Sequence, residues 1–487
     1  MLPYEDLIKP DKNSTKAVYI QIATKFIELI QKGKIRSGAK LPGSRQLALK
    51  LGINRNTMNA AYDELIAQGY ALSLQRKGVF VVENLPEIKG EALDESLQSK
   101  SYHGIAPFAW NEQLQTIPLV SLQEYQLVID DGFPDVRLAP IDSLMREYRS
   151  LSRRSPNRKF LKYGPPGGSH RLKMALFKHL ADTRGINIAP ENMLITRGCQ
   201  MGFYIAAKLL IMPGDYMVVG TSNYFAVDAT FRHFGARLLR VPVDENGMDI
   251  DKLEALCKKK KIKGVYVIPH HHHPTMVTLS TDRRMKLLQL AAAYNFAIIE
   301  DDYDFDFHYD TNPILPLASI DPYGHVLYVG SITKTVAPGL RMGFLIGPEK
   351  FIDKAARFRL LIDRQGDTLM EEAMASLYEL GEIDGHLRRS LKIYRERRNV
   401  FCHLLEEKLN DAVTFEIPRG GLGIWTVFDK SIDLTQLFKR SLKMGLMIND
   451  PSIYNNEVFN ENGVRLGFAS VNETEINRAL GILESAL

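Results

Sequence analysis

One stretch of the sequence places a lysine, a serine and an arginine at spacings that suit covalent and anion-binding chemistry. Lys334 follows an apolar, strand-like run, with Ser331 three positions before it and Arg341 seven positions after it. A desolvated lysine amine forms a Schiff base with a carbonyl group, while a hydroxyl and a guanidinium both match phosphate oxygens. The three residues therefore suit an aldehyde cofactor that carries a phosphate. Taken alone, the stretch is more typical of a solvated lysine beside an ordinary turn at Pro338-Gly339, so the prediction depends on the other motifs.

A second motif, Thr196-Arg197-Gly198-Cys199-Gln200, lies between a strand-like run over residues 193–195 and an apolar helix that we expect over residues 201–210. Backbone N–H groups at the start of a helix form an anion site. A glycine turn before a helix is common, however, and this motif is weak evidence by itself.

The acidic run over residues 300–304 comes directly after the strand-like residues 296–299. A carboxylate in this run suits a protonated pyridine nitrogen and would keep such a cofactor an electron sink. Tyr303, in the same run, is within reach of the phenolic oxygen of such a ring. The alternatives are a metal site and an acidic cap on the following loop.

Two single residues fit the same centre. Tyr224, which follows Val218-Val219-Gly220, suits stacking on a cofactor ring, although a core or surface tyrosine is an equal alternative. Arg465 lies in a strand-like run and suits a bidentate clamp on a substrate carboxylate. Otherwise it is an ordinary arginine at a strand end.

Four consecutive histidines, residues 270–273, stand between Pro269 and Pro274. Adjacent side chains of an extended segment alternate between its faces, so the four cannot all bind one metal ion, and no cysteine accompanies them. We therefore predict no metal site, and a role for His273 at the edge of the cofactor.

An alternation of elements is expected to position these residues. Strand-like runs over residues 216–219, 264–268 and 296–299 alternate with helix-like segments that include 172–184 and 282–294. This order predicts an α/β domain with a parallel or mostly parallel sheet. Ligands of such sheets bind beyond the carboxyl ends of the strands.

The first eighty residues follow a different pattern. Helical periodicity over residues 18–30 is followed by a short helix that Ser44 would cap and by a third helix over residues 55–65. Two strand-like stretches, 71–74 and 78–82, then flank a basic turn. The order predicts a helix-turn-helix with a basic hairpin wing.

The positions of polar residues in this region favour DNA as its partner. A recognition helix meets base edges at its N-terminal end, and phosphate or minor-groove contacts come from basic residues and from glycine in the wing. The alternative is a three-helix interaction domain whose cations are only solvated. The predicted DNA-binding residues are Arg45, Arg55, Asn56, Thr57, Arg76, Lys77 and Gly78.

Composition limits the remaining possibilities. A length of 487 residues predicts two or three domains, and a net charge of +5 restricts nucleic-acid contact to a local basic patch. Three scattered cysteines are too few for a disulfide framework, which favours a reducing compartment. With no run of about 20 apolar residues, we expect a cytoplasmic protein with no membrane partner.

The N-terminal block resembles the winged helix of the GntR superfamily of bacterial regulators. That family's pattern is Leu-Pro-Ser-x-Arg, then Ser-Arg-Asn-Thr, then a wing with glycine. Here Gly43 and Asn54 stand where serines are usual.

The order of the later motifs resembles the fold type I aminotransferases that use pyridoxal 5′-phosphate, and the whole chain resembles the MocR (GabR-like) regulators. The implied fold class is α/β, with an N-terminal winged helix-turn-helix (residues 1–83), a linker (84–119) and an aminotransferase-like domain (120–487). By this resemblance Lys334 holds the internal aldimine, Asp301 the pyridine nitrogen and Tyr303 the phenolic oxygen. Gly198, Cys199, Gln200, Ser331 and Arg341 hold the phosphate, Tyr224 stacks on the ring, Arg465 takes an effector carboxylate, and Tyr163 reaches the phosphate of a neighbouring subunit, which implies a homodimer.

The chain departs from the family pattern on the cofactor and effector side. The usual His-Gln-aromatic-Pro-x-Gly becomes His271-His272-His273-Pro274-Thr275-Met276, and Pro165 replaces an expected aspartate. We therefore expect a transcriptional regulator that binds pyridoxal phosphate and an operator DNA. It would respond to the cofactor itself or to an amino compound that forms an external aldimine with it, with weak or no turnover. The alternative is an active aminotransferase with an appended DNA-binding head.

Overall fold

The computed structural model describes residues 3–11, 14, 16–75, 77–85, 125, 127–310, 314–455 and 458–487. The chain divides into two units, Met1–Trp110 and Asn111–Leu487. From residue 86 onward, the predicted linker over residues 84–119 lies outside the described residues.

The N-terminal unit contains the predicted helices and hairpin. Its elements are α1 (Tyr4–Leu7), α2 (Val18–Gln31), α3 (Ser44–Leu51), α4 (Arg55–Ala67) and the antiparallel strands β1 (Ala71–Leu74) and β2 (Gly78–Val81). Phe26, Leu47, Met58 and Leu65 are buried together in its core, because their helical spacing places them on the inner faces of α2, α3 and α4.

One predicted cap in this unit is wrong. Gly43 is the N-cap of α3 and forms no side-chain cap bond, so Ser44 is the first residue of the helix rather than its cap. In α4, by contrast, the Asn54 side chain accepts a hydrogen bond from the Asn56 N–H at 2.8 Å. Asparagine is a strong N-cap residue, so the replacement of serine at this position keeps the helix start intact.

The C-terminal unit is built on a seven-stranded sheet in the order β4-β12-β11-β10-β9-β5-β6. The prediction of a mostly parallel sheet is confirmed, with β12 antiparallel to both of its neighbours. The strands are β4 (Met193–Thr196), β5 (Tyr216–Gly220), β6 (Arg237–Val241), β9 (Ile262–Val267), β10 (Ala297–Asp302), β11 (Val326–Ser331) and β12 (Gly343–Ile346).

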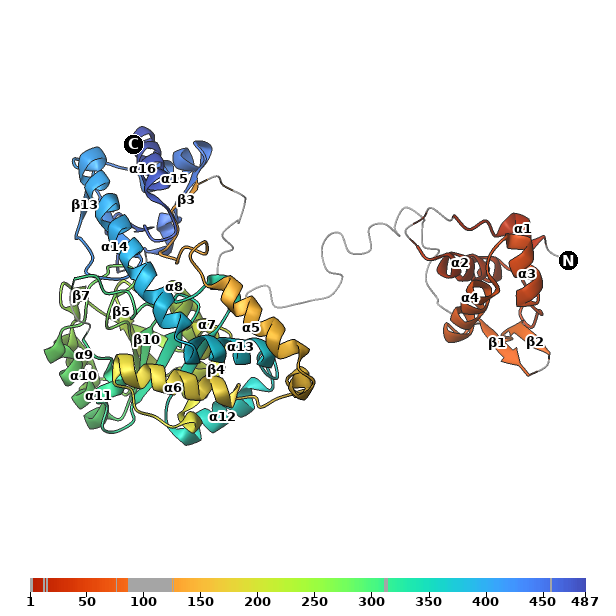
Figure 1. Ribbon diagram of the computed structural model, residues 1–487, viewed down its shortest axis with the longest axis horizontal. Coiled ribbons are helices and arrows are strands. Elements are labelled where there is room, and N and C mark those ends of the chain that lie inside the picture. Colours follow the sequence, from red (N-terminus) through yellow and green to blue (C-terminus); the bar gives the residue numbers. More distant parts are fainter. Residues whose placement is uncertain are drawn as a thin grey trace. The chain divides into compact units, whose positions relative to one another are not determined.

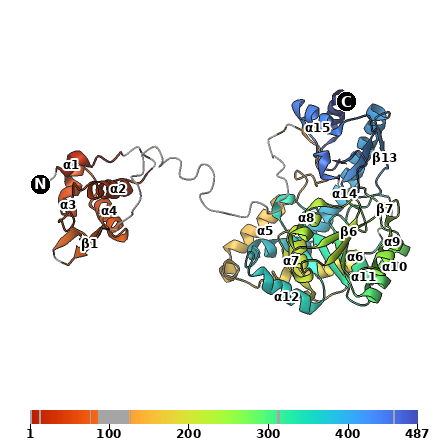
Figure 2. The ribbon, with the colours of Figure 1, turned by 180° about the vertical axis from the view of Figure 1, so that it is seen from behind.

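Helices cover both faces of this sheet (Figure 1, and from behind in Figure 2). In β5, Val218 packs into one core with α6 (His170–Arg184), α10 (Thr281–Tyr294) and α13 (Thr368–Glu379). Its neighbours Met217 and Val219 pack into a second core with α7 (Cys199–Leu210), α8 (Phe225–His233) and α12 (Glu349–Arg359). Successive side chains of a strand point to opposite faces, so a continuous apolar run is buried on both sides.

A smaller sheet completes this unit. The long helix α14 (Glu382–Leu409) leads from α13 to the antiparallel strands β13 (Val413–Phe415), β14 (Gly423–Phe428) and β16 (Gly463–Gly467), as Figure 1 shows. Helices α15 (Leu434–Lys443) and α16 (Glu473–Ala486) pack on it. The remaining elements are β3 (Leu127–Val128), α5 (Ile141–Arg153), β7 (Val243–Asp244), β8 (Gly247–Met248), α9 (Ile250–Cys257), α11 (Leu317–Ile320), β15 (Leu446–Met447) and the 3-10 helices Ser155–Leu161, Pro190–Asn192, Pro338–Leu340 and Pro451–Ile453.

The first described strand of the unit pairs with a strand near the end of the chain. β3 pairs in parallel with β15, and the Gly467 N–H donates to the Asp130 carbonyl at 2.8 Å. These bonds fix residues 130–133 beside β16, at one border of the candidate site. None of the described helices is both long and apolar enough to cross a membrane.

Candidate functional site

Lys334 lies in the turn that follows β11, and its amine contacts the segment 130–133. The Lys334 Nζ donates to the Gly132 carbonyl at 2.6 Å and lies 3.6 Å from the centre of the Phe133 ring. Burial lowers the pKa of Lys334 to about 8; nearby Arg465 adds to the shift and Asp131 opposes it. A substantial part of this amine is therefore neutral near physiological pH, as a nucleophile requires.

The backbone of this turn is held from several sides. The Lys334 N–H donates to Ser331 Oγ at 3.3 Å, and the Thr335 hydroxyl donates to Asp306 at the same distance. His386 Nε2 lies 2.9 Å from the Thr335 carbonyl. The turn therefore fixes the start of the lysine side chain, and Ser331 helps to hold the turn.

Asp301 belongs to β10 itself, since the strand continues to Asp302 and does not end at Ile299 as the sequence predicted. The strand continues because Asp301 pairs with Val329 of β11, and the Tyr266 hydroxyl donates to its carboxyl at 2.6 Å. The other carboxyl oxygen, Oδ1, is buried without a hydrogen-bond partner among the described residues.

Burial raises the pKa of Asp301 to about 8; Asp302 and Asp304 add to the shift, while the Tyr266 hydroxyl opposes it. A buried carboxyl oxygen without a hydrogen-bond partner is costly unless a ligand completes it. A protonated pyridine nitrogen is such a partner, so the residue fits the predicted cofactor.

The residues predicted to bind the phosphate include several at the start of α7. Gly198 has φ +78°, and a Cβ atom there would lie only 2.8 Å from Arg341 Nη2. A Cβ atom on Gly343 would lie 3.1 Å from the Cys199 backbone nitrogen. The helix begins at Cys199, two residues earlier than predicted, so Cys199 and Gln200 belong to its first turn. The two glycines thus allow Arg341 and β12 to pack closely against the helix N-terminus, and an arginine beside a helix N-terminus suits a phosphate.

His273 and Tyr224 lie side by side, with ring centres 5.3 Å apart. His273 Nε2 is 2.8 Å from the Asp131 carboxylate. Burial lowers the pKa of His273, against the opposing charge of Asp131. The predicted stacking of Tyr224 stays a prediction.

Arg465 and Tyr303 complete the centre. Arg465 is buried on β16, its Nε and Nη2 have no hydrogen-bond partner among the described residues, and its guanidinium lies 5.7 Å from the Tyr303 ring. The Tyr303 hydroxyl donates to the His271 carbonyl at 2.8 Å, which leaves its oxygen free only to accept. Arg465 is thus available to an anion.

Tyr163 is the predicted site residue that the structure keeps apart from the others. Its side chain is 77% exposed and lies against the Arg364 guanidinium, 4.1 Å from its ring centre.

Sequence reasoning missed the segment 130–133, although it contributes Asp131, Gly132 and Phe133 to the surroundings of Lys334. The Asp-Asp-Gly turn after the apolar residues 127–129 was the available signal. Tyr266, the hydroxyl partner of Asp301, had no signal beyond its place in a buried strand.

The four consecutive histidines face four different partners. His270 Nε2 lies 2.6 Å from the Ile314 carbonyl, His271 Nδ1 2.8 Å from Asp304, and His272 Nδ1 2.8 Å from Thr275. No group of metal-binding side chains occurs in the described part of the chain.

The predicted DNA-binding residues lie on the surface of the N-terminal unit. Arg45, Arg55, Asn56, Lys77 and Gly78 are exposed and Thr57 is partly buried, whereas Arg76 lies outside the described residues. Gly78 has φ +111°, a conformation that favours glycine in the wing turn.

Each of the two units matches a known protein family. Residues 130–483 match the family model "Aminotransferase class I and II", and residues 18–81 match "Bacterial regulatory proteins, gntR family". The chain is 28% identical to the uncharacterized HTH-type transcriptional regulator YisV of Bacillus subtilis, covering 96% of each chain. It is 26% identical to the probable rhizopine catabolism regulatory protein MocR of Rhizobium meliloti, covering 98% of this chain and 95% of that one. A crystal structure of Pyrococcus horikoshii kynurenine aminotransferase in complex with PMP matches 78% of this chain and 96% of that one, with a TM-score of 0.71 and 26% identity.

Proposed function

The chain belongs to the aminotransferase class I and II family and, with its gntR-type head, to the MocR type of HTH transcriptional regulators; from this premise we propose that its DNA binding responds to pyridoxal 5′-phosphate. The signal is either the cofactor itself or an amino compound that reacts with it at Lys334.

The observation that carries this proposal is that Lys334 and Asp301 both have strongly shifted pKa values. The pKa of Lys334 is lowered to about 8. Asp301, in the strand β10 that pairs with β11, has a pKa raised to about 8 and one carboxyl oxygen without a hydrogen-bond partner among the described residues. Perturbed groups of this kind gather at functional sites. When bound, pyridoxal phosphate supplies an aldehyde that condenses with amines and a ring that takes up electrons.

The residues around the two groups have separate roles in this proposal. Asp301 keeps its proton at neutral pH and holds it for the pyridine nitrogen. Arg341 and the N-terminus of α7 bind the phosphate, and Arg465 binds the carboxylate of an amino compound. The Lys334 amine must leave the Gly132 carbonyl and the Phe133 ring before it reacts, so binding breaks this hydrogen bond.

A homodimer is part of the same proposal. Leu161 and Tyr163 are 70% and 77% exposed, and Leu361, on the segment that contacts Tyr163 through Arg364, is 81% exposed. Large apolar side chains exposed together are typical of a protein interface. Two subunits would present two winged helices to paired half-sites.

The recognition helix provides a direct check of DNA binding. Arg55→Ala removes an exposed guanidinium from the N-terminal end of α4, so we expect affinity for a duplex selected from a random pool to fall roughly 5- to 150-fold. Lys77→Ala, in the wing, should weaken binding to all sequences alike and reduce its salt dependence. Fluorescence anisotropy at several salt concentrations measures both. Equal affinity of Arg55→Ala and the unaltered chain would contradict the assignment.

One experiment separates the regulator from the alternative, an active aminotransferase. The same full-length preparation is tested for binding to the selected duplex with and without pyridoxal phosphate, and for multiple turnover with an amino donor and a keto acid. We expect at least a roughly five-fold change in DNA affinity and no sustained turnover. Sustained turnover with unchanged DNA affinity would establish the alternative.

A further inference from the structure

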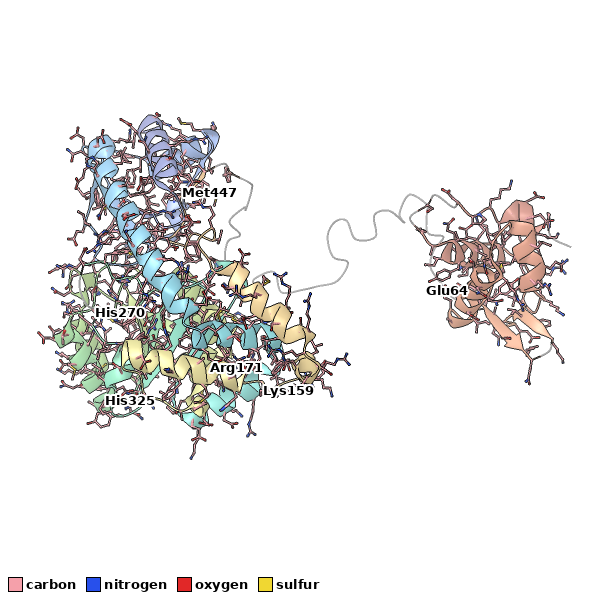
Figure 3. All side chains as sticks on the ribbon, in the orientation of Figure 1. Glu64, Lys159, Arg171, His270, His325 and Met447 are labelled. Atoms are coloured by element: carbon pink, nitrogen blue, oxygen red, sulfur yellow. The ribbon has the colours of Figure 1, made fainter. Side chains whose placement is uncertain are left out.

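A cavity of about 910 Å³ lies in the C-terminal unit, and none of the residues assigned to the cofactor lines it. The β7–β8 hairpin, the loop that follows β9, His308 and the edge formed by β13 and β14 surround it. His270, from that loop, is labelled in Figure 3. Lys334, Asp301 and Arg341 do not line this cavity. Its volume is in the range of small-molecule sites.

The wall of this cavity is rich in aromatic rings. The His308 ring centre lies 4.8 Å from that of His271 and 5.9 Å from that of His270, and Trp425 and Phe415 complete the aromatic lining. Burial, with nearby His271, lowers the pKa of His308 to about 3, so the ring carries no charge at physiological pH. Uncharged aromatic rings attract a cation over their faces.

Two imidazole nitrogens of this wall, His270 Nδ1 and His308 Nε2, are buried without a hydrogen-bond partner among the described residues. A neutral imidazole nitrogen that is not protonated accepts a hydrogen bond, as an ammonium N–H requires. Unpartnered buried atoms in a cavity of this size indicate a missing ligand.

The residues that line the cavity carry more negative than positive charge. Four carboxylates, Asp244, Glu245, Glu416 and Glu461, line the cavity, and Arg419 is the one arginine or lysine among the lining residues. Asp244 is paired with Arg283 at 2.6 Å, whereas the other three form no ion pair with a described residue. The surplus of negative charge favours a cationic ligand.

We propose that this cavity is a second ligand site, separate from the Lys334 centre, that binds a small organic ammonium ion. The ammonium group lies among the imidazoles with its N–H directed to His308, and the carboxylates attract it from the rim. The proposal does not depend on the proposed cofactor.

Two contacts join this wall to the surroundings of Lys334. The His271 carbonyl accepts the Tyr303 hydroxyl at 2.8 Å. On the other side, Trp425 lies 5.5 Å from the Tyr454 ring, whose hydroxyl donates to Asp131 at 2.8 Å. A cation in the cavity therefore acts on residues that contact the cofactor site.

The test follows ligand binding through the fluorescence of Trp425. In the full-length chain with Trp110→Phe, which removes the second tryptophan, fluorescence is titrated without cofactor against benzyldimethylammonium. This tertiary amine is protonated at neutral pH and cannot form a Schiff base with an aldehyde. Phenylacetate, an anion of similar size, is the matched ligand. We expect a saturable change with the ammonium ion and none with phenylacetate.

Substitutions inside and outside the lining test whether the ammonium ion binds in this cavity. Glu416→Gln with Glu461→Gln should weaken the affinity roughly five-fold, because two attracting carboxylates are lost. Glu396→Gln, an exposed glutamate on α14 outside the lining, and Lys334→Ala should leave it unchanged. No saturable signal, equal binding of phenylacetate, an unchanged affinity in the double variant or a loss in Lys334→Ala would each overturn the proposal.

Discussion

A Lys334→Ala variant is expected to lose covalent capture of pyridoxal phosphate completely. The unaltered protein with added cofactor should show a band near the long-wavelength end of the roughly 330–430 nm range, and borohydride should bleach it and leave the label on Lys334. The variant should show neither the band nor the label, because Lys334 is the residue whose amine donates to the Gly132 carbonyl at this site. Absorption spectra and peptide mass spectrometry measure both.

Lys173→Ala is the matched control for this experiment. Burial also lowers the pKa of Lys173, which lies on α6 outside the candidate site. Its substitution should therefore leave both the band and the label intact. A borohydride-stable label on another residue of the Lys334→Ala variant would show that the assignment of the lysine is wrong.

The pKa of Lys334 adds a pH dependence to the same reaction. Only the neutral amine attacks a carbonyl, and the pKa of about 8 lies below the usual 10.5. The rate of capture should therefore rise with pH through about 8 and level off above it. A rate that continues to rise up to the ordinary lysine pKa of 10.5 would indicate that the Lys334 amine of the dissolved protein is exposed to water.

An Asp301→Asn variant is expected to bind the cofactor roughly 100-fold more weakly. Asparagine has the same shape and still accepts the Tyr266 hydroxyl, but it cannot form the charged pair with a protonated pyridine nitrogen. A buried charged pair that loses one partner costs about 3–5 kcal/mol, and neutralisation of the ring nitrogen would relieve part of that cost. Absorbance titration of the cofactor measures the affinity.

Asp302→Asn separates this effect from simple loss of structure. Asp302 is the next residue of β10, points to the opposite face, accepts the Tyr328 hydroxyl at 2.5 Å and lies 3.6 Å from the Arg184 guanidinium. Its substitution should lower the melting temperature and leave cofactor affinity within about three-fold, since it breaks a structural network only. An Asp301→Asn variant that binds as tightly as this control would contradict the role of Asp301.

The sequence by itself determined the local elements and the order of the motifs. The helix predicted over residues 55–65, the wing strands and the alternating strands and helices follow from short-range periodicity, capping and turn residues, which act within a few positions. The lysine turn was identifiable for the same reason, because Ser331, Lys334 and Arg341 are close in the chain. The assignment of individual cofactor residues stays a prediction from this pattern.

Only the tertiary structure decided what surrounds Lys334. Gly132 is 202 positions from Lys334, and no periodicity links two residues at that separation. The same applies to Asp131 with His273, and to the continuation of β10 through acidic residues that read as a loop. The strand continues there because Asp301 and Asp302 pair with Val329 and Gly330 of β11, and the Tyr266 and Tyr328 hydroxyls donate to the two carboxyls. Burial and pairing across the fold set the pKa of Lys334 and of Asp301, and these depend on distances that exist only after the chain has folded.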